Sequence, residues 1–434
     1  MNYYSTNNNS PIVSFKDATI NGQAPDKGLY FPEYIPALPE GLIENIEALS
    51  NEEIAFNVIK PYVGDTIPED ILKTIVAETV NFSIPLVPVT DSISSLELFH
   101  GPTLAFKDIG ARFMSRCLSY FVRNENKKVT VLVATSGDTG GAVANGFYDV
   151  PNVDVIILYP SEKVSSVQEK QLTTLGKNIH ALEVNGTFDD CQQMVKNAFM
   201  DEELTSKIFL TSANSINVAR WLPQQFYYFF AYKQWVDKIN PPVISVPSGN
   251  FGNICAGILA QASGLPVKHF IAACNANDVV PHFLSTNEYL PKKAVATISN
   301  AMDVGEPSNF VRILKIFSEN VSNLKEKLSG WAVSDDDTRA TIKMVFEEEG
   351  YLLDPHGAVG YFALNEYLRD HPDEKGMVVE TAHPVKFYDV VEPVIGTKIA
   401  IPAMVEEQLK LEKKSVWMEN EYESLKSFLL NKKL

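Results

Sequence analysis

Short runs of apolar, mostly β-branched residues recur along the chain, and they limit its possible folds more than any other feature. These runs occupy residues 129–136, 153–160, 179–184, 208–214, 243–248, 269–274 and 377–383. Because their hydrophobicity is continuous rather than alternating, we predict strands buried on both faces, as in a mostly parallel sheet covered by helices. Amphipathic stretches at 166–176, 189–204 and 217–235 predict helices between them. The sequence therefore predicts an α/β fold, and 434 residues are enough for two packed domains.

Three of the predicted strands end in small or polar residues directly before a predicted helix. The turns read TSGDTGGA (135–142), SANSIN (212–217) and SGNFGN (248–253). Ligands of open parallel sheets bind outside the carboxyl ends of the strands, so a functional site is expected at these turns.

Lys107 is a cation placed among apolar and small residues where a helix begins. Apolar residues recur at three- and four-residue intervals from Phe106 to Phe121, which predicts a helix that Thr103 or a neighbour opens. The helix dipole and the apolar surroundings both favour the neutral amine. A neutral lysine is a nucleophile that forms Schiff bases with carbonyl compounds such as pyridoxal phosphate. A lysine whose amine reaches water past an apolar surface explains this stretch equally well.

The loop PSGNFGNICAG (247–257) has the features of a phosphate site. Gly249 and Gly252 let the backbone approach an anion, and a helix that starts near Ile254 offers free N–H groups and the positive end of its dipole. The loop is neither a Walker A motif nor GxGxxG, so a nucleotide is disfavoured. Taken alone, an ordinary glycine turn is the alternative interpretation.

A second anion site is predicted in SANSINVARW (212–221). Asn214, Ser215 and Asn217 offer amide and hydroxyl donors, and a helix capped by Asn214 or Ser215 carries Arg220 one to two turns along. A guanidinium can hold a phosphate or carboxylate through two parallel hydrogen bonds. The alternative is an arginine in a surface salt bridge.

Two further strand ends carry short polar side chains. In TSGDTGGAV, Ser136, Asp138 and Thr139 lie beside free helix N–H groups, although these residue types also cap ordinary helices. In ETAHPVKF, Thr381 and Lys386 follow a strand, and a threonine hydroxyl can hydrogen-bond a pyridine nitrogen without protonating it. A strand end without a ligand is the alternative for both.

Charge and cysteine content exclude several classes of function. A formal net charge of −17 repels polyanions, so we expect neither a nucleic-acid nor a membrane partner, and an anionic ligand needs local cations. The four cysteines form no CxxC pair, which argues against a zinc ribbon, and no metal site is predicted. The polar N-terminus does not resemble a targeting segment, and the sequence has no run of 18 or more apolar residues that could span a membrane. We therefore expect a cytoplasmic protein.

The motifs HGPTLAFKD, ATSGDTGGAV, SANSINVAR, VPSGNFGN and TAHPVKF follow one another between residues 99 and 387. In this order they closely resemble the bacterial and fungal type of the threonine synthase family, and KGLYFP and SNAMDVGEPSN extend the similarity along the chain. The resemblance implies a two-domain, fold-type-II pyridoxal-phosphate enzyme, similar to the tryptophan synthase β subunit.

The resemblance also implies a role for each motif residue. Lys107 resembles the lysine that forms the Schiff base, and residues Gly249, Asn250, Phe251, Gly252 and Asn253 resemble the cradle of the cofactor phosphate. Thr381 resembles the partner of the pyridine nitrogen, and Asp138 the partner of the ring hydroxyl. The implied substrate-binding residues are Ser136, Thr139, Asn214, Ser215, Asn217 and Arg220, with Lys386 as a candidate for either phosphate.

The implied reaction converts O-phospho-L-homoserine and water to L-threonine and phosphate, with no obligate protein partner. A phospho-lyase, a serine/threonine dehydratase of the same fold, and a non-catalytic pyridoxal-phosphate-binding regulator are the alternatives. We expect an N-terminal segment (1–84), a smaller domain with Lys107 and SGDTGG (85–220) and a larger domain with SGNFGN (221–434). The tail from about Val405, rich in Glu and Lys, predicts a solvated surface helix.

Overall fold

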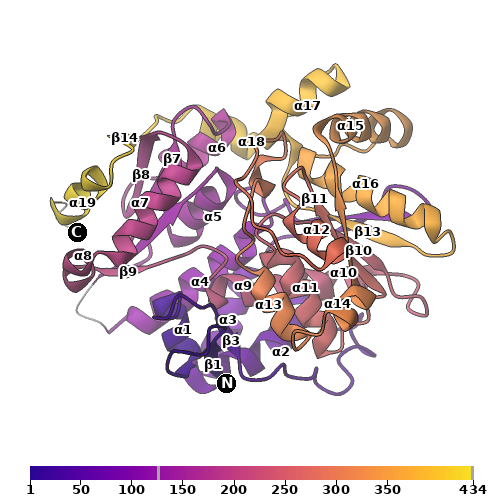
Figure 1. Cartoon of the computed structure of the whole chain (residues 1–434), viewed down its shortest axis with the longest axis horizontal. Helices are drawn as coiled ribbons and strands as arrows, with labels where there is room; N and C mark the ends of the chain where they lie inside the picture. Colours follow the sequence, from indigo (N-terminus) through magenta and orange to yellow (C-terminus); the bar gives the residue numbers. More distant parts are fainter. Residues whose placement is uncertain (125–127, 432–434) are drawn as a thin grey trace.

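The computed structural model describes residues 1–124 and 128–431, which form two large sheets covered by helices (Figure 1). One sheet has five strands, all parallel to their neighbours. In spatial order these are β14 (Ser415–Glu419), β8 (Ile179–Asn185), β7 (Val153–Pro160), β6 (Val129–Ala134) and β9 (Phe209–Thr211). Every residue of β6 and β7 is buried, as their continuous hydrophobicity predicts.

The other large sheet has six strands, and only the hairpin of its last two is antiparallel. In spatial order these are β12 (Leu328–Ala332), β11 (His269–Cys274), β10 (Val243–Pro247), β13 (Gly376–Glu380), β5 (Ile93–Glu97) and β4 (Leu86–Pro88). The predicted α/β fold with mostly parallel sheets covered by helices is confirmed.

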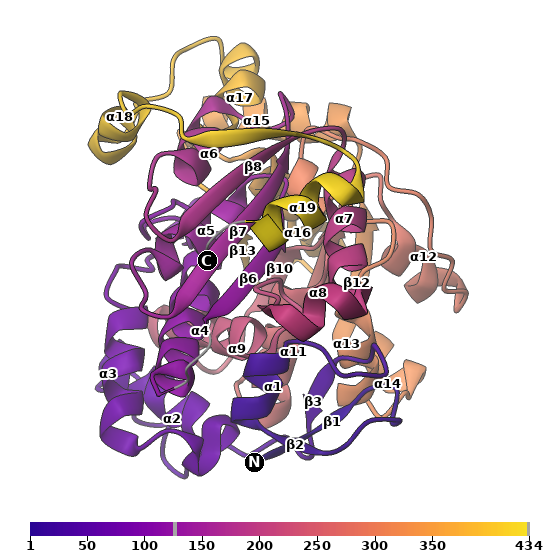
Figure 2. The ribbon, with the colours of Figure 1, turned by 90° about the vertical axis from the view of Figure 1, so that its left-hand side faces the viewer.

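A small antiparallel sheet lies at the N-terminus, beside the first helices (Figure 2). It consists of β1 (Asn2–Ser5), β2 (Val13–Ser14) and β3 (Tyr30–Pro32), and is followed along the chain by α2 (Asn51–Val63) and α3 (Glu69–Thr79). Helix α1 (Phe15–Asn21) packs against α4 (Lys107–Val122), which also contacts α3, α5 (Asp138–Phe147) and α9 (Val218–Trp221). Helix α4 thus joins the N-terminal segment to the layers around both large sheets.

The remaining helices connect the strands or cover the sheets. Between β7 and β10 these are α6 (Ser166–Thr173), α7 (Phe188–Met200), α8 (Glu202–Lys207) and α10 (Phe226–Gln234). Further along the chain they are α11 (Gly252–Ser263), α12 (Val279–Thr286), α13 (Phe310–Ile316), α14 (Val321–Lys327), α15 (Asp335–Glu349), α16 (Pro355–Asp370), α17 (Tyr388–Ile395), α18 (Ala403–Leu409) and α19 (Tyr422–Asn431). Within the described ranges, no helix is both long and apolar enough to cross a membrane. A cytoplasmic location stays a prediction.

The C-terminal tail corrects one prediction. Instead of a single solvated helix, it forms α18, β14 and α19, and β14 adds a strand to the five-stranded sheet beside β8 (Figure 2). Met418 of β14 is buried while Val416 and Trp417 are exposed, so the tail covers the sheet with only part of its apolar surface. The strand β5 lies in the range expected for the smaller domain (85–220) but pairs in the six-stranded sheet. The strand β14 lies in the range expected for the larger domain (221–434) but pairs in the five-stranded sheet. The domain limits at 84 and 220 stay a prediction.

Candidate active site

One cavity of about 1450 Å³ collects the turns that the sequence singled out. Its walls come from the carboxyl ends of β6, β9, β10 and β13, and therefore from both large sheets. The sequence-predicted residues that line it are Lys107, Ser136, Asp138, Thr139, Asn214, Ser215, Arg220, Gly249, Asn250, Phe251, Gly252, Asn253 and Thr381. Asn217 and Lys386 are not among the lining residues.

Lys107 is held beside Thr381 by a short backbone pairing. The N–H of Phe106 donates to the carbonyl of Thr381 at 2.9 Å, and the N–H of His383 donates to the carbonyl of Leu104 at 3.0 Å. The lysine that begins α4 and the threonine that follows β13 consequently face one cavity, although they are far apart in the sequence.

The start of α4 differs from the prediction. Thr103 does not open the helix, which begins at Lys107. The Thr103 hydroxyl instead donates to one Asp108 carboxylate oxygen at 2.6 Å, and its N–H donates to the other at 2.9 Å. These bonds fix the turn that delivers Lys107, because both carboxylate oxygens of Asp108 are engaged within the same six-residue segment 103–108.

The Lys107 amine is surrounded by charge. Its side chain is 17% exposed, and its Nζ lies 3.8 Å from the Asp138 carboxylate. Burial lowers the pKa of Lys107, Asp138 opposes this shift, and the charges of Lys386 and Arg220 add to it. The net shift is toward the neutral amine, the direction that the sequence predicts for a nucleophilic lysine.

In the cofactor-free protein, Lys107 should react with an acylating reagent at lower pH than an ordinary lysine in a peptide. The neutral fraction rises as pH passes through the pKa, so a lowered pKa moves this rise to lower pH. Asp138→Asn should move it lower still, because it removes the charge that favours the ammonium. Peptide mapping of the labelled protein measures the midpoint, with Asp149→Asn on the surface as control; an upward shift in Asp138→Asn would contradict the assignment.

Asp138 is the anionic centre of the site. Its Oδ1 accepts hydrogen bonds from Lys386 Nζ at 2.8 Å and from Gln168 Nε2 at 2.9 Å. Burial raises the pKa of Asp138, but the charges of Lys386 and Lys107 more than offset burial and hold that pKa well below its usual range. The carboxylate is therefore ionised and fixed in orientation.

The structure changes the predicted role of one neighbour of Asp138, Lys386, and adds a neighbour that was not predicted, Gln168. Lys386 is fully buried and bonds Asp138 and the Thr103 carbonyl, so it fixes these groups rather than reaching a phosphate in the cavity. Gln168 was not singled out in the sequence, since it lies in a helix start with a capping pattern and no other signal. Only the folded chain brings it against Gly137 and Asp138.

The SGNFGN loop forms a cradle of free N–H groups at the start of α11. Among the hydrogen bonds of the described residues, none uses a backbone N–H from Gly249 to Ile254 as donor. Phe251 turns the chain with a φ of 61°, in the left-handed region, directly before the helix. Helix α11 begins at Gly252 rather than near Ile254, which brings more of the loop to the positive end of the dipole. Such an arrangement is suited to a phosphate.

Replacing Gly249 with alanine should weaken cofactor binding by about tenfold or more, because the backbone of the cradle would have to move. A Cβ there would lie 2.6 Å from Met302 Cα, a backbone atom that cannot rotate away. Absorbance titration of cofactor-free protein measures the affinity. Gly396→Ala, at the end of α17 with open space around it, is the control that strains the backbone away from the cavity. Unchanged affinity in Gly249→Ala would contradict the cradle.

Arg220 belongs to the second predicted anion site, at residues 212–221, and has unused hydrogen-bond donors. Its side chain is buried, its Nη1 donates to the Ala213 carbonyl at 2.6 Å, and its Nε has no partner among the described residues. Burial lowers the pKa of Arg220 to about 10, so the guanidinium remains charged at neutral pH. Gly110 of α4 permits this packing, since a Cβ there would lie 2.6 Å from the Arg220 carbonyl oxygen. A buried cation that lines a cavity is suited to an anion.

The helix cap of this segment differs from the prediction. Asn217 caps α9, not Asn214 or Ser215, and its Oδ1 accepts the N–H of Ala219 at 2.9 Å. The Asn217 amide also donates to the carbonyls of Thr19 and Ser212. Asn217 therefore shapes the segment, while Asn214 and Ser215 line the cavity.

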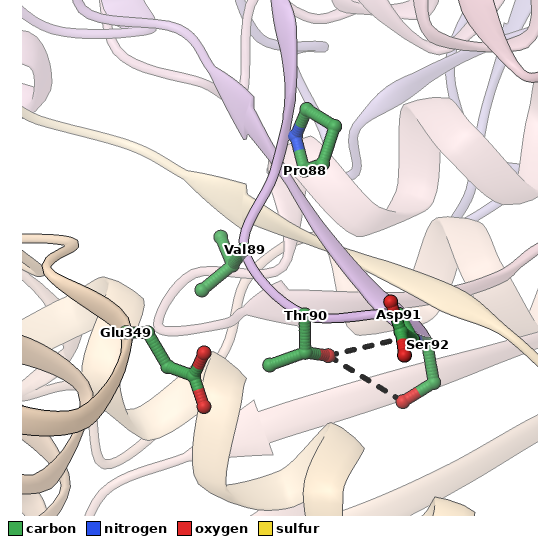
Figure 3. A pocket seen from close by; sticks show the side chains of 6 residues that line it. All are labelled: Pro88, Val89, Thr90, Asp91, Ser92 and Glu349. Carbon is green, nitrogen blue, oxygen red and sulfur yellow. Dashed lines mark hydrogen bonds between the residues drawn. The ribbon is translucent and has the colours of Figure 1, made fainter.

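A smaller hollow of about 550 Å³ lies at the turn between β4 and β5 (Figure 3). Its lining residues are Pro88, Val89, Thr90, Asp91, Ser92 and Glu349. Both charged side chains are acidic, and Thr90 is engaged with Ser92 (Figure 3). An anionic ligand is not suited to this hollow, and the chemistry belongs to the larger cavity.

Comparison with known proteins identifies the family. Residues 95–381 match the family of pyridoxal-phosphate dependent enzymes, residues 2–80 match the threonine synthase N terminus, and residues 357–429 match the threonine synthase C-terminal family. Threonine synthase of Escherichia coli strain K12 is 43% identical over 99% of this chain and 100% of its own. The chain belongs to the threonine synthase family. It is a pyridoxal-phosphate-dependent enzyme that acts on a small molecule.

Other members of the threonine synthase family agree in sequence and structure. The Saccharomyces cerevisiae protein is 35% identical over 90% of this chain and 88% of its own. The crystal structure of the Escherichia coli enzyme superposes with a TM-score of 0.92 and covers 99% of this chain and 100% of the other. A structure of pyridoxal-phosphate-bound threonine synthase from Brucella melitensis superposes with a TM-score of 0.92 at 34% identity, covering 99% of each chain.

The cavity of this threonine synthase family member fits pyridoxal phosphate. The free N–H groups of the cradle suit the phosphate, and the Lys107 amine in the same cavity suits the carbonyl carbon. Thr381 is 6% exposed and lines the cavity, and a threonine hydroxyl suits a ring nitrogen. When bound, the cofactor supplies an electron sink for negative charge that develops on the substrate.

Proposed function

We propose that the enzyme converts O-phospho-L-homoserine and water to L-threonine and phosphate. The observation that carries this proposal is a pair of anion sites in one cavity: the cradle at residues 249–254 and the buried Arg220 with Asn214 and Ser215. The first suits the cofactor phosphate, and the second suits the phosphate of a substrate. A serine/threonine dehydratase needs no second phosphate site.

Separate groups in the cavity suit the two ends of this substrate. The N–H groups of Asp138 and Thr139 have no acceptor among the described residues and lie at the start of α5, where they suit the substrate carboxylate together with the Ser136 and Thr139 hydroxyls. At the other end, Arg220 and Ser215 donate to the phosphate. Holding both ends orients the carbons between them toward Lys107.

Lys107 is the group that moves protons in this proposal. As a neutral amine it takes the proton from the α-carbon, and its position at the start of α4 lets one amine serve further transfers along the substrate. Arg220 stabilises the charge on the departing phosphate, since its residue lines the cavity and its guanidinium stays charged at neutral pH. Asp138, fixed by Lys386, favours a positive charge on Lys107 after each proton is taken up.

The test is a joint assay of phosphate and threonine with purified, cofactor-loaded protein and O-phospho-L-homoserine. Equal amounts of the two products are expected. Phosphate without threonine would make the protein a phospho-lyase. The absence of both products would favour the dehydratase or the regulator. L-serine as substrate, with pyruvate as the readout, separates those last two.

A further inference from the structure

The Ser215 hydroxyl has both of its acceptor sites occupied. Its Oγ accepts from the side-chain amide of Asn250 at 2.8 Å and from that of Asn309 at 3.2 Å. Among the described residues, no acceptor is bonded to the Ser215 hydroxyl hydrogen, and the side chain lines the cavity. A hydroxyl carries one donor and two acceptor sites, so Ser215 is left as a donor toward the cavity.

Asn309 owes its orientation to Arg312. It lies fully buried directly before α13, which packs beside α11 (Figure 1). The Asn309 Oδ1 accepts from Arg312 Nη1 at 2.8 Å, so the amide nitrogen faces Ser215 and the Asn250 carbonyl, the latter at 3.1 Å. Since a guanidinium only donates, Arg312 excludes the flipped amide.

Arg312 is a fully buried cation whose partners are neutral. It donates to the carbonyls of Tyr30, Ser215 and Ile216. Its guanidinium also lies 4.3 Å from the ring centre of Trp221. No carboxylate within the described ranges forms an ion pair with it. Burying a charge without a counter-charge is costly.

An anion in the cavity would offset this cost. Two of the three carbonyls that Arg312 holds belong to Ser215 and Ile216, and both residues line the cavity, as Arg220 does. A phosphate there would be attracted by the charge of Arg312, which is bonded to residues 215 and 216, as well as by the charge of Arg220, which lines the cavity.

We propose that Asn309 and Arg312 are positioning residues of the second phosphate site. Arg312 sets the Asn309 amide, the amides of Asn309 and Asn250 occupy both acceptor sites of Ser215, and Ser215 can then only donate to the phosphate. Asn250 belongs to the cofactor cradle, so Ser215 also ties the two anion sites together. This inference rests on the proposed function, which assigns the substrate phosphate to residues 214–220.

The test is calorimetric titration of cofactor-loaded protein with inorganic phosphate. If Asn309 acts through Ser215, Asn309→Ala weakens phosphate binding about tenfold in the wild-type background but less than about twofold in Ser215→Ala. Equal weakening in both backgrounds, or none in either, overturns the proposal. The matched control is Asn320→Ala, which removes the exposed cap of the next helix, α14, and leaves phosphate affinity unchanged.

A second variant covers the case in which Asn309→Ala does not fold. Asn309→Asp keeps the shape and the acceptor for Arg312 but offers Ser215 an acceptor in place of a donor. We expect phosphate binding to weaken by about tenfold or more, and unchanged affinity overturns the proposal. Wild-type protein that binds phosphate but makes no threonine would refute the proposed function alone. Wild-type protein that makes threonine but binds no phosphate would refute this inference alone.

Discussion

Replacing Lys107 with alanine should lower threonine formation by about 10⁴-fold or more, because in the proposed reaction one amine both holds the cofactor and moves the protons. Of the described lysines that line the cavity, only Lys107 belongs to α4, the SGDTGG turn or the strand end at Thr381. Lys386, the nearest further amine of the described chain to Asp138, is fully buried and committed to Asp138 and the Thr103 carbonyl. It is therefore unable to substitute.

A second readout separates loss of chemistry from loss of fold. Reduction with borohydride should attach the cofactor covalently to the wild-type chain and leave Lys107→Ala at its unlabelled mass. Lys73→Ala, an exposed lysine on α3, is the control and should keep both activity and labelling. A Lys107→Ala variant with more than about one-hundredth of wild-type activity would contradict the assignment.

The strands could be predicted from the sequence because burial on both faces requires a continuous run of apolar residues. Residues 129–134 and 153–160 are apolar almost throughout, and the structure buries each of them. By contrast, β14 has one buried residue, Met418, among exposed neighbours, so its hydrophobic pattern carries little information. It forms a strand because it pairs with the free edge of β8, a strand more than two hundred residues earlier in the chain.

Some residues of the candidate site could likewise be predicted from the sequence, and others could not. Lys107, Asp138 and the SGNFGN loop lie where strands end and helices begin, and parallel topology brings such ends together. Helix caps were less readable, because Asn214, Ser215 and Asn217 are all good caps and only the packing of Asn217 on Thr19 decides between them. Gln168 and Asn309 orient the site through partners far away in the sequence, Asp138 and Ser215, and Arg312 also bonds the Ser215 carbonyl, so no local pattern reveals these contacts.

Arg220→Ala should lower kcat/KM for O-phospho-L-homoserine by about 100- to 1000-fold, the range expected when a charged donor to a developing anion is lost. Both constants should change: KM rises because the phosphate is bound before reaction, and kcat falls because charge builds up on the phosphate as it leaves. Cofactor affinity should stay the same, since the cradle from Gly249 to Ile254 offers its own donors.

The conservative variant tells a phosphate role from a packing role. Arg220→Lys retains the charge but loses the planar donor pair, so it should recover part of kcat/KM while remaining well below wild type. Arg339→Ala on the surface of α15 is the control for arginine loss and should leave both constants unchanged. If Arg220→Ala lost the cofactor together with activity, the guanidinium would serve the cradle, and the cavity would hold one anion site where the proposed reaction needs two. The proposal for threonine formation would then lose the observation that carries it.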